Sequence, residues 1–290
     1  MTPRFGLSTH LFHNERLEGR HLQAIRQHGF DLVELFATAT HFDYRDLPRV
    51  REMRDWLRGA GLEAGSMHGP IFDAFRGGAW GRPYSNASPH AAARQEAIDE
   101  TRLALDAACE LGCATLVLHL GLPAGPHVPP GDNDAGAARR SLDAIAEAAR
   151  GAGVRLALEV IPNPLSSPAE LLRWMDDESG LESAGVCLDV GHAHMMGGAA
   201  EAAELLSGHI VTTHVHDNNG REDSHLVPPA GTIDWPAALT ALWKVGYGGP
   251  LVFEVADHGD AAGVLSRLVG ARQRLQAILS DLAQPFDFDR

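Results

Sequence analysis

Eight short apolar segments alternate along the chain with segments of helical periodicity, and this alternation limits the fold more than any other feature. The sequence predicts strands at 5–8, 32–36, 62–67, 115–118, 154–160, 185–190, 209–215 and 250–255. Apolar residues recur at helical spacing between them, for example in 88–111 and 134–150. Such alternation indicates parallel strands joined by right-handed crossovers. Eight units predict the α/β class and a single (β/α)8 TIM barrel that spans residues 1–290 as one domain.

Residue types that bind metals or carry protons lie at or near the ends of these predicted strands. They are His10, Glu34, His68, His119, Glu159, Asp189, His214, His216 and Glu254. In α/β barrels the active site lies at the C-terminal ends of the strands and in the loops that follow. We therefore expect these side chains, distant in sequence, to meet at that end of the barrel.

The segment Val186–His194, V-C-L-D-V-G-H-A-H, shows this pattern most clearly. Its apolar run ends at Asp189, and His192 and His194 follow within five residues. Taken alone, the segment fits equally well an aspartate that caps the next helix and histidines in a solvated loop. Recurrence of the pattern at the other strand ends favours a functional site. Eight other histidines, His13 and His41 among them, are expected to be structural or solvated.

Two long segments, 69–89 and 218–232, lack clear periodicity. Long loops at the catalytic end of a barrel are usually lids or binding loops. The segment 69–89, which contains Trp80, is therefore expected to be a lid over the substrate, with a disordered insertion as the alternative. Residues 285–290 are expected to form a tail.

The charge inventory narrows the chemistry further. The formal net charge is -14, and Lys244 is the only lysine. Lysine-based covalent catalysis is therefore not expected, and neither is a nucleic-acid partner, whose phosphate backbone requires a basic patch. Carboxylates gathered without cations repel one another and are costly to bury. A divalent cation bound by carboxylates and imidazoles resolves this, with zinc or manganese expected and cobalt or magnesium as alternatives.

The sequence shows no segment that targets a membrane. No apolar run approaches the ~18 residues of a membrane span, and the first residues lack the apolar region of a signal peptide. The three cysteines are too few and too irregular for a disulfide framework or a C-x-x-C zinc site. We therefore expect a cytoplasmic protein without a membrane partner.

A set of short motifs follows the predicted strands in order. It reads M-H-G-P-I, L-H-L-G, L-E-V, L-D-V-G-H, H-V-H-D-N, D-S-H-L-V-P-P-A-G-T-I-D-W and F-E-V. The set resembles the xylose isomerase-like barrel superfamily, which includes sugar-phosphate isomerases and epimerases and the type IV apurinic endonucleases. The resemblance runs from the first strand to the last.

The resemblance implies a metal held by Glu159, Asp189, His214 and Glu254. His214 and His216 share one face of their strand, so periodicity does not choose between them. The superfamily pattern His-x-x-Asp, matched by His214 and Asp217, implies that His214 is the ligand and that His216 faces the substrate.

The endonuclease branch of the superfamily uses a three-zinc cluster. Its additional ligand types are also present in this chain, at His68, His119, His192, Asp223 and His225. The resemblance therefore implies one divalent metal per chain, and up to three if the full ligand set is occupied.

The first functional hypothesis is a metal-dependent isomerase or epimerase of a small sugar, a polyol ketone or a sugar phosphate, acting in carbohydrate metabolism. The cation would stabilise an enediolate, and Glu159 and Glu254 would act as acid and base. Substrate contacts are expected from His10, Glu34, Trp80, His192, His216 and Arg221. Arg76 or Arg82 could hold a phosphate in a bidentate contact.

The second hypothesis is a di- or tri-zinc phosphodiester hydrolase that resembles the apurinic endonucleases. The full ligand set favours it, whereas the net charge of -14 and the single lysine disfavour binding to DNA. The isomerase or epimerase is therefore preferred. A barrel that binds sugar or metal without catalysis is a third hypothesis, and a homo-oligomer is compatible with all three.

Overall fold

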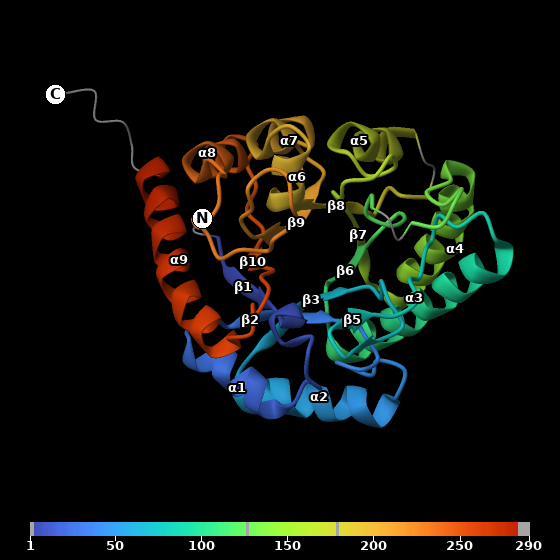
Figure 1. Ribbon diagram of the computed structural model, residues 1–290, viewed down its shortest axis with the longest axis horizontal. Coiled ribbons are helices and arrows are strands. Elements are labelled where there is room, and N and C mark those ends of the chain that lie inside the picture. The colour runs from blue at the N-terminus through green and yellow to red at the C-terminus, as the bar shows by residue number, and fades with distance from the viewer. Residues whose placement is uncertain (1–2, 126–127, 178–179, 284–290) are drawn as a thin grey trace.

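The computed structural model describes residues 3–125, 128–177 and 180–283, so the predicted tail at 285–290 lies outside the described residues. Eight parallel strands close into a barrel in the order β1-β10-β9-β8-β7-β6-β3-β2 (Figure 1). The strands are β1 (Phe5–Ser8), β2 (Leu32–Phe36), β3 (Glu63–His68), β6 (Thr115–Leu118), β7 (Arg155–Glu159), β8 (Gly185–Asp189), β9 (Ile210–Val215) and β10 (Leu251–Phe253). The (β/α)8 barrel predicted from the alternation is confirmed.

Helices surround the barrel and link successive strands (Figure 1). They are the 3-10 helix η1 (Thr9–Phe12) and the α-helices α1 (Gly19–Gln27), α2 (Leu47–Ala60), α3 (Ala91–Leu111), α4 (Ala135–Ala152), α5 (Pro168–Asp177), α6 (Val190–Met195), α7 (Ala199–Leu205), α8 (Trp235–Lys244) and α9 (Ala261–Leu282). Local signals set their ends. The Asp134 side chain accepts a hydrogen bond from the Ala137 N–H at the start of α4, and Gly153 ends that helix at φ 67°.

The alternation of side chains along each strand separates two apolar regions. Most buried apolar residues lie in one core that includes both strand and helix residues. A small second cluster contains Val117, Ala157 and Cys187. Because side chains alternate with period two, Ala157 lies on the same strand face as Glu159, and Cys187 on the same face as Asp189. The polar residues at these strand ends therefore lie on the same strand faces as this small cluster.

The segment 69–89 contains a small antiparallel hairpin of β4 (Phe75–Arg76) and β5 (Ala79–Trp80). The backbone N–H of Phe75 donates to Thr40 Oγ1 at 2.9 Å, which ties the hairpin to the loop after β2. The Trp80 ring stacks on Phe72, with 5.1 Å between ring centroids. These contacts give the segment a defined structure, in contrast to the alternative of a disordered insertion, and its role as a lid stays a prediction.

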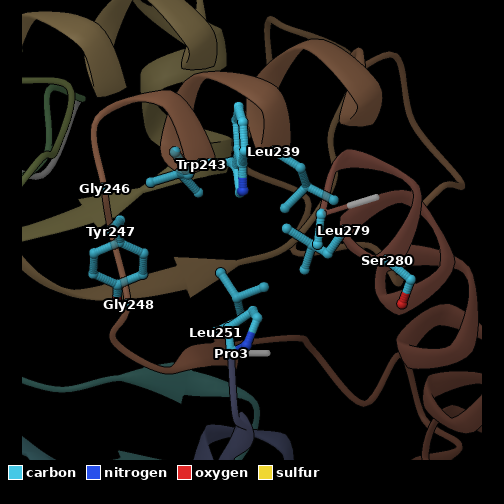
Figure 2. Close-up of a pocket in the computed structure, with 11 residues that line it drawn as sticks. Pro3, Leu239, Trp243, Gly246, Tyr247, Gly248, Leu251, Leu279 and Ser280 are labelled. Atoms are coloured by element: carbon cyan, nitrogen blue, oxygen red, sulfur yellow. The ribbon is translucent and has the colours of Figure 1, made fainter. Parts of the chain in front are cut away.

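A largely apolar pocket of about 450 Å³ lies between α8 and α9 (Figure 2). Leu239, Trp243 and Leu279 are among its lining residues, together with Pro3, which precedes β1, and Leu251, the first residue of β10. The pocket is therefore at the opposite end of the barrel from the polar strand ends. Among the described residues, no helix combines the length and the apolar character that crossing a membrane requires.

Candidate metal centre and active site

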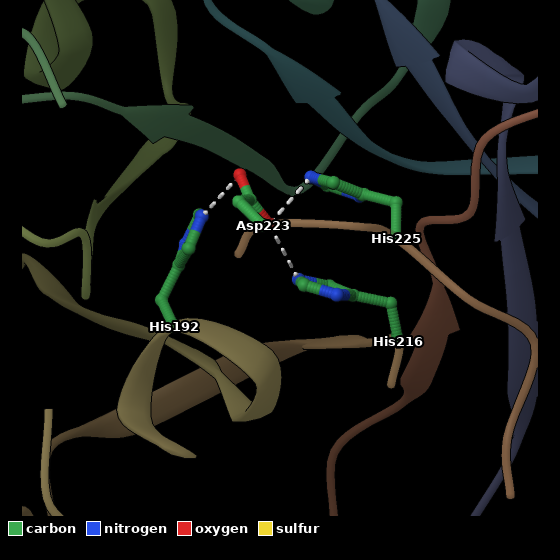
Figure 3. Close-up of side chains that lie close together, drawn as sticks. All are labelled: His192, His216, Asp223 and His225. Carbon is green, nitrogen blue, oxygen red and sulfur yellow. Dashed lines mark hydrogen bonds and ion pairs between the residues drawn. The ribbon is translucent and has the colours of Figure 1, made fainter. Parts of the chain in front are cut away.

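The polar side chains predicted at the strand ends come together in groups that could hold metal ions. The central group is Glu159, Asp189, His214 and Glu254, all buried. The flanking group is His68, His119 and Glu159, and the outer group is His192, His216, Asp223 and His225 (Figure 3). Within each group, one potential ligand atom per residue lies within 4.8 Å of the others. The expected convergence of these side chains is thus present in the structure.

His214 lies at the middle of the central group. Its Nδ1 atom is 2.9 Å from Glu159 Oε1, 3.4 Å from Glu254 Oε2 and 3.7 Å from Asp189 Oδ2. Its Nε2 atom lies 3.0 Å from Glu34 Oε1. When Nε2–H donates to Glu34, the neutral ring presents a lone pair at Nδ1 to three carboxylates. A metal cation or a proton is needed between these atoms.

The same hydrogen-bond pattern recurs at His68, His192 and His225. In each ring, Nδ1 lies 2.8–3.0 Å from a backbone carbonyl oxygen, that of Gly69, Val160 and Glu254 respectively. Because a carbonyl only accepts, Nδ1 carries the hydrogen and Nε2 has the lone pair of the neutral ring. The three Nε2 atoms lie 3.0–3.2 Å from the carboxylates of Glu159 or Asp223. Metal-binding histidines are typically oriented in this way.

The electrostatics of the cluster favour positive charge between its members. Burial raises the pKa of Glu159, but His214 and His119 outweigh burial and hold that pKa well below its ordinary value. Burial lowers the pKa of His192, yet Asp189 and Asp223 raise it to about 10. The field that holds protons on these rings would equally hold divalent cations. The residues present therefore fit a metal site.

Asp189 combines two roles that the sequence presented as alternatives. Its Oδ1 atom accepts a hydrogen bond of 2.6 Å from the His192 N–H and thereby caps α6. Its Oδ2 atom lies 3.4 Å from His192 Nδ1, and also faces His214. Capping orients the carboxylate and leaves the second oxygen directed into the central group.

Two residues expected to contact substrate, Glu34 and Arg221, make other contacts in the structure. Glu34 is fully buried, and its carboxylate is bound by His214 Nε2 and by the Ser66 hydroxyl at 2.8 Å. It therefore supports His214 from inside the barrel, and the contact with substrate expected for it stays a prediction. The Arg221 side chain is exposed, and the contact described for this residue is a backbone hydrogen bond to Asn219 Oδ1. The contact between Arg221 and substrate therefore stays a prediction.

His10 and Trp80 do lie beside the polar cluster. The His10 ring is 5.3 Å from the His225 ring, and 6.4 Å from the stacked ring of Trp80. Burial, together with neighbouring His225, lowers the pKa of His10 well below its ordinary value. His10 is therefore neutral at neutral pH. It forms a boundary between the charged outer group and the aromatic hairpin.

The sequence did not indicate the contacts that two further residues, His13 and Arg82, make in the structure. The His13 ring stacks on His10, with 4.7 Å between ring centroids, and on Trp80, with 5.1 Å. His13 follows His10 by three residues, and the one turn of the 3-10 helix η1 brings the two rings face to face. Arg82 is engaged by both carboxylate oxygens of Glu96, so it is not a free phosphate-binding side chain.

Comparisons with known proteins agree with this architecture. The chain is 28% identical over 275 residues to an uncharacterised protein of Methanocaldococcus jannaschii, a match that covers 89% of this chain and 85% of that protein. It is similar in structure to a D-tagatose 3-epimerase-like protein, with a TM-score of 0.78, 24% identity, and coverage of 97% of this chain and 100% of the other. An L-ribulose 3-epimerase gives a TM-score of 0.77, 20% identity, and coverage of 98% and 99%.

The family assignment comes from a model that spans most of the sequence. The model of the xylose isomerase-like TIM barrel matches residues 22–279, a range that includes every barrel strand except β1. The superfamily indicated by the ordered strand-end motifs is therefore confirmed. The chain belongs to the xylose isomerase-like TIM barrel family.

Proposed function

We propose that this protein is a metal-dependent isomerase or epimerase of a small sugar, polyol ketone or sugar phosphate. The observation that carries the proposal is that two buried glutamates approach one ring nitrogen of His214. Glu159 Oε1 and Glu254 Oε2 lie 2.9 Å and 3.4 Å from the same ring nitrogen. The names of the structural relatives, a D-tagatose 3-epimerase-like protein and an L-ribulose 3-epimerase, are consistent with this reaction class.

The cation would be held by the central group, for which zinc or manganese suits the carboxylate and imidazole ligands. A divalent cation bound there would act as a Lewis acid on neighbouring substrate oxygens. Glu34 would keep Nε2 of His214 protonated, so that Nδ1 is the atom available to the metal.

The two glutamates differ in how strongly the protein holds them. Both oxygens of Glu159 are engaged, Oε1 by His214 and Oε2 by His68 and His119. The nearest imidazole nitrogens to Glu254 are farther away, at 3.4 Å for His214 and 3.9 Å for His225. We assign Glu254 as the base that first accepts a proton from the substrate carbon. Glu159 then returns a proton to the substrate carbon, which it would receive from the His68 or His119 ring that contacts its Oε2 atom.

The proposed substrate contacts at the mouth of the barrel remain His10, Trp80, His192, His216 and Arg221. Trp80 offers an aromatic surface beside His10, on which an apolar face of a sugar ring can pack. A homo-oligomeric state and a cytoplasmic location stay predictions from the sequence.

One observation favours the alternative, a zinc-dependent phosphodiester hydrolase. The flanking and outer groups supply donors for two metals beyond the central one, as a multi-metal hydrolase requires. The net charge of -14 disfavours a nucleic-acid substrate. The isomerase or epimerase is therefore the better supported of the two.

Solvent isotope exchange tests the proposal. Metal-loaded protein in D2O should incorporate deuterium at a carbon next to the carbonyl of a ketose substrate, as followed by NMR on a panel of ketoses and ketose phosphates. Glu254→Gln should abolish exchange, because the amide cannot accept the proton. Glu63→Gln is the matched control, since Glu63 is exposed at the other end of β3. Efficient nicking of abasic duplex DNA without sugar exchange would establish the hydrolase instead.

A further inference from the structure

A cavity of about 460 Å³ opens at the N-terminal end of the barrel, where the strands begin. Its inner wall includes buried residues from four strands, namely Leu32 of β2, Ser66 of β3, Thr115 of β6 and Thr212 of β9. The polar groups of the candidate active site lie at the other end of these strands. The cavity is therefore a separate space, which the proposed reaction does not use.

Glycines on both neighbours of β2 explain why this end of the barrel is open. The interior of a TIM barrel is normally filled by bulky branched side chains. A Cβ atom at Gly65 of β3 would lie 2.6 Å from Leu32 Cδ1, and one at Gly6 of β1 would lie 3.2 Å from Leu32 Cδ2. The Leu32 side chain therefore lies along the wall, over the two adjacent strands, and leaves space beside it.

Thr212 brings a hydroxyl group without a partner to this space. Thr212 and His214 are two residues apart on β9, so their side chains share the face that points into the barrel. Thr212 is 2% exposed, and its Oγ1 atom is buried without a hydrogen-bond partner among the described residues. Buried hydroxyl groups in proteins are nearly always hydrogen-bonded. The Thr212 hydroxyl therefore calls for a partner that the described residues do not supply.

Two further hydroxyl groups lie on the same wall. The Ser66 O–H donates to Glu34 Oε2 at 2.8 Å, and the Ser66 oxygen keeps lone pairs that can accept a hydrogen bond. Thr115 is paired in register with Ser66 on the neighbouring strand. A ligand with several hydroxyl groups of its own could donate to and accept from these three side chains.

The charges at the rim of the cavity disfavour an anionic ligand. Arg4 Nη1 lies 2.8 Å from Glu63 Oε2, and Arg4 Nη2 lies 3.5 Å from Asp31 Oδ1. The guanidinium group is thus paired with two carboxylates, which leaves no net positive charge to attract a phosphate. Leu32 and Val211 supply an apolar surface on which the carbon chain of a ligand can pack. The lining therefore suits an uncharged molecule that combines hydroxyl groups with C–H groups.

We propose that this cavity is a second binding site, which takes a small uncharged polyol or sugar. Its volume of about 460 Å³ is in the range of small-molecule pockets, about 300–1,000 Å³. Hydroxyl groups of the ligand bond to Ser66, Thr115 and Thr212, and its carbon chain packs on Leu32 and Val211. The inference goes beyond the proposed function, because it concerns the opposite end of the barrel and requires neither a metal nor turnover.

Methyl NMR of the full-length protein, with Zn2+ added, distinguishes the two ends of the barrel. Labelled Leu and Val methyl groups provide reporters at the cavity, Leu32 and Val211, and one beside the candidate active site, Val160, whose carbonyl contacts His192. Xylitol is the probe, because it is an uncharged polyol without a carbonyl group. Titration should shift the Leu32 and Val211 signals along a saturable curve, with the millimolar Kd expected for so small a ligand.

Two variants test the contact with the hydroxyl groups. Thr212→Val and Thr115→Val each remove a hydroxyl group and nearly keep the shape of the side chain, and either one suffices if the other does not fold. Each should weaken xylitol binding by about 2–12-fold, the cost of one hydrogen bond. Thr240→Val is the matched control, since the Thr240 hydroxyl donates to the Pro236 carbonyl on α8 and does not line the cavity. It should bind xylitol as wild type does.

Any of three results overturns the proposal. If the Leu32 and Val211 signals do not shift up to about 100 mM xylitol, the cavity holds only water. If the Val160 signal alone shifts, the polyol binds only at the candidate active site. If the folded hydroxyl variants bind xylitol as wild type does, the polyol is an adventitious additive only.

Discussion

Replacing Glu34 by Gln tests whether Glu34 supports a metal ligand or contacts the substrate. Glu34 is fully buried, its Oε1 is 3.0 Å from His214 Nε2, and its Oε2 accepts from the Ser66 hydroxyl. Burial raises the pKa of Glu34, but His214 outweighs burial and lowers it, so the carboxylate is charged at neutral pH. The substitution keeps the size of the side chain and removes this charge.

The expected result is weaker metal binding in the central group. Partners that orient a metal-binding histidine typically contribute about 10–100-fold in metal affinity, which corresponds to roughly 1.4–2.8 kcal/mol. Competition titration of Zn2+ or Mn2+ against a chelator measures this directly. At saturating metal, KM for the sugar should be close to that of wild type.

A defined outcome refutes this reasoning. If Glu34→Gln leaves metal affinity unchanged and raises KM at saturating metal, Glu34 contacts the substrate, as its place near the end of a strand suggested. Glu63→Gln is the control, since Glu63 is exposed and pairs with Arg4 at 2.8 Å on the far side of the barrel. It should change neither quantity.

Three other perturbations test the structure. Burial lowers the pKa of His41 from 6.5 to about 4. Between these two pH values the unfolded chain binds more protons than the folded chain, so the free energy of unfolding decreases by up to about 3 kcal/mol as the pH is lowered. His41→Gln should flatten this dependence in urea titrations at pH 7 and 5, and an unchanged slope would contradict it. Gly191→Ala should displace the His216 ring and cost about 1–3 kcal/mol of stability. The control Gly151→Ala should not, because a Cβ atom at Gly151 meets open space. Equal urea midpoints for the two variants would show that the His216 ring is not confined. Removing metal by chelation should lower the melting temperature. The loss corresponds to about 2.7 kcal/mol of stability if free metal was present at 100 times its Kd before chelation. An unchanged melting temperature would argue against bound metal.

Much of the fold follows from local patterns. The eight strands lie within two residues of their predicted limits, because alternating apolar strands and amphipathic helices have few ways to bury their apolar faces. The segment 69–89 is the exception. Its two-residue strands are too short to produce a periodic signal, and contacts such as that between Phe75 and Thr40 hold them in place.

The sequence by itself also determined which chemistry the strand ends can support. Residues such as Glu159, Asp189 and His214 stand at the ends of parallel strands, and barrel closure must bring such ends together whatever the details of packing. The near absence of lysine then makes a metal cation the natural counter-charge for the carboxylates. Both conclusions need only residue types and their order.

Only the tertiary structure decided which residues share a group. Glu34 and His214 are 180 positions apart, and their contact depends on the stagger of strands across the closed barrel. The lone pairs of His192 and His225 are directed by the carbonyls of Val160 and Glu254, which belong to other parts of the chain. His216 faces Asp223 because Gly191 leaves room for its ring. Distances and tautomers of this kind arise from packing between distant segments, which periodicity along one segment does not contain.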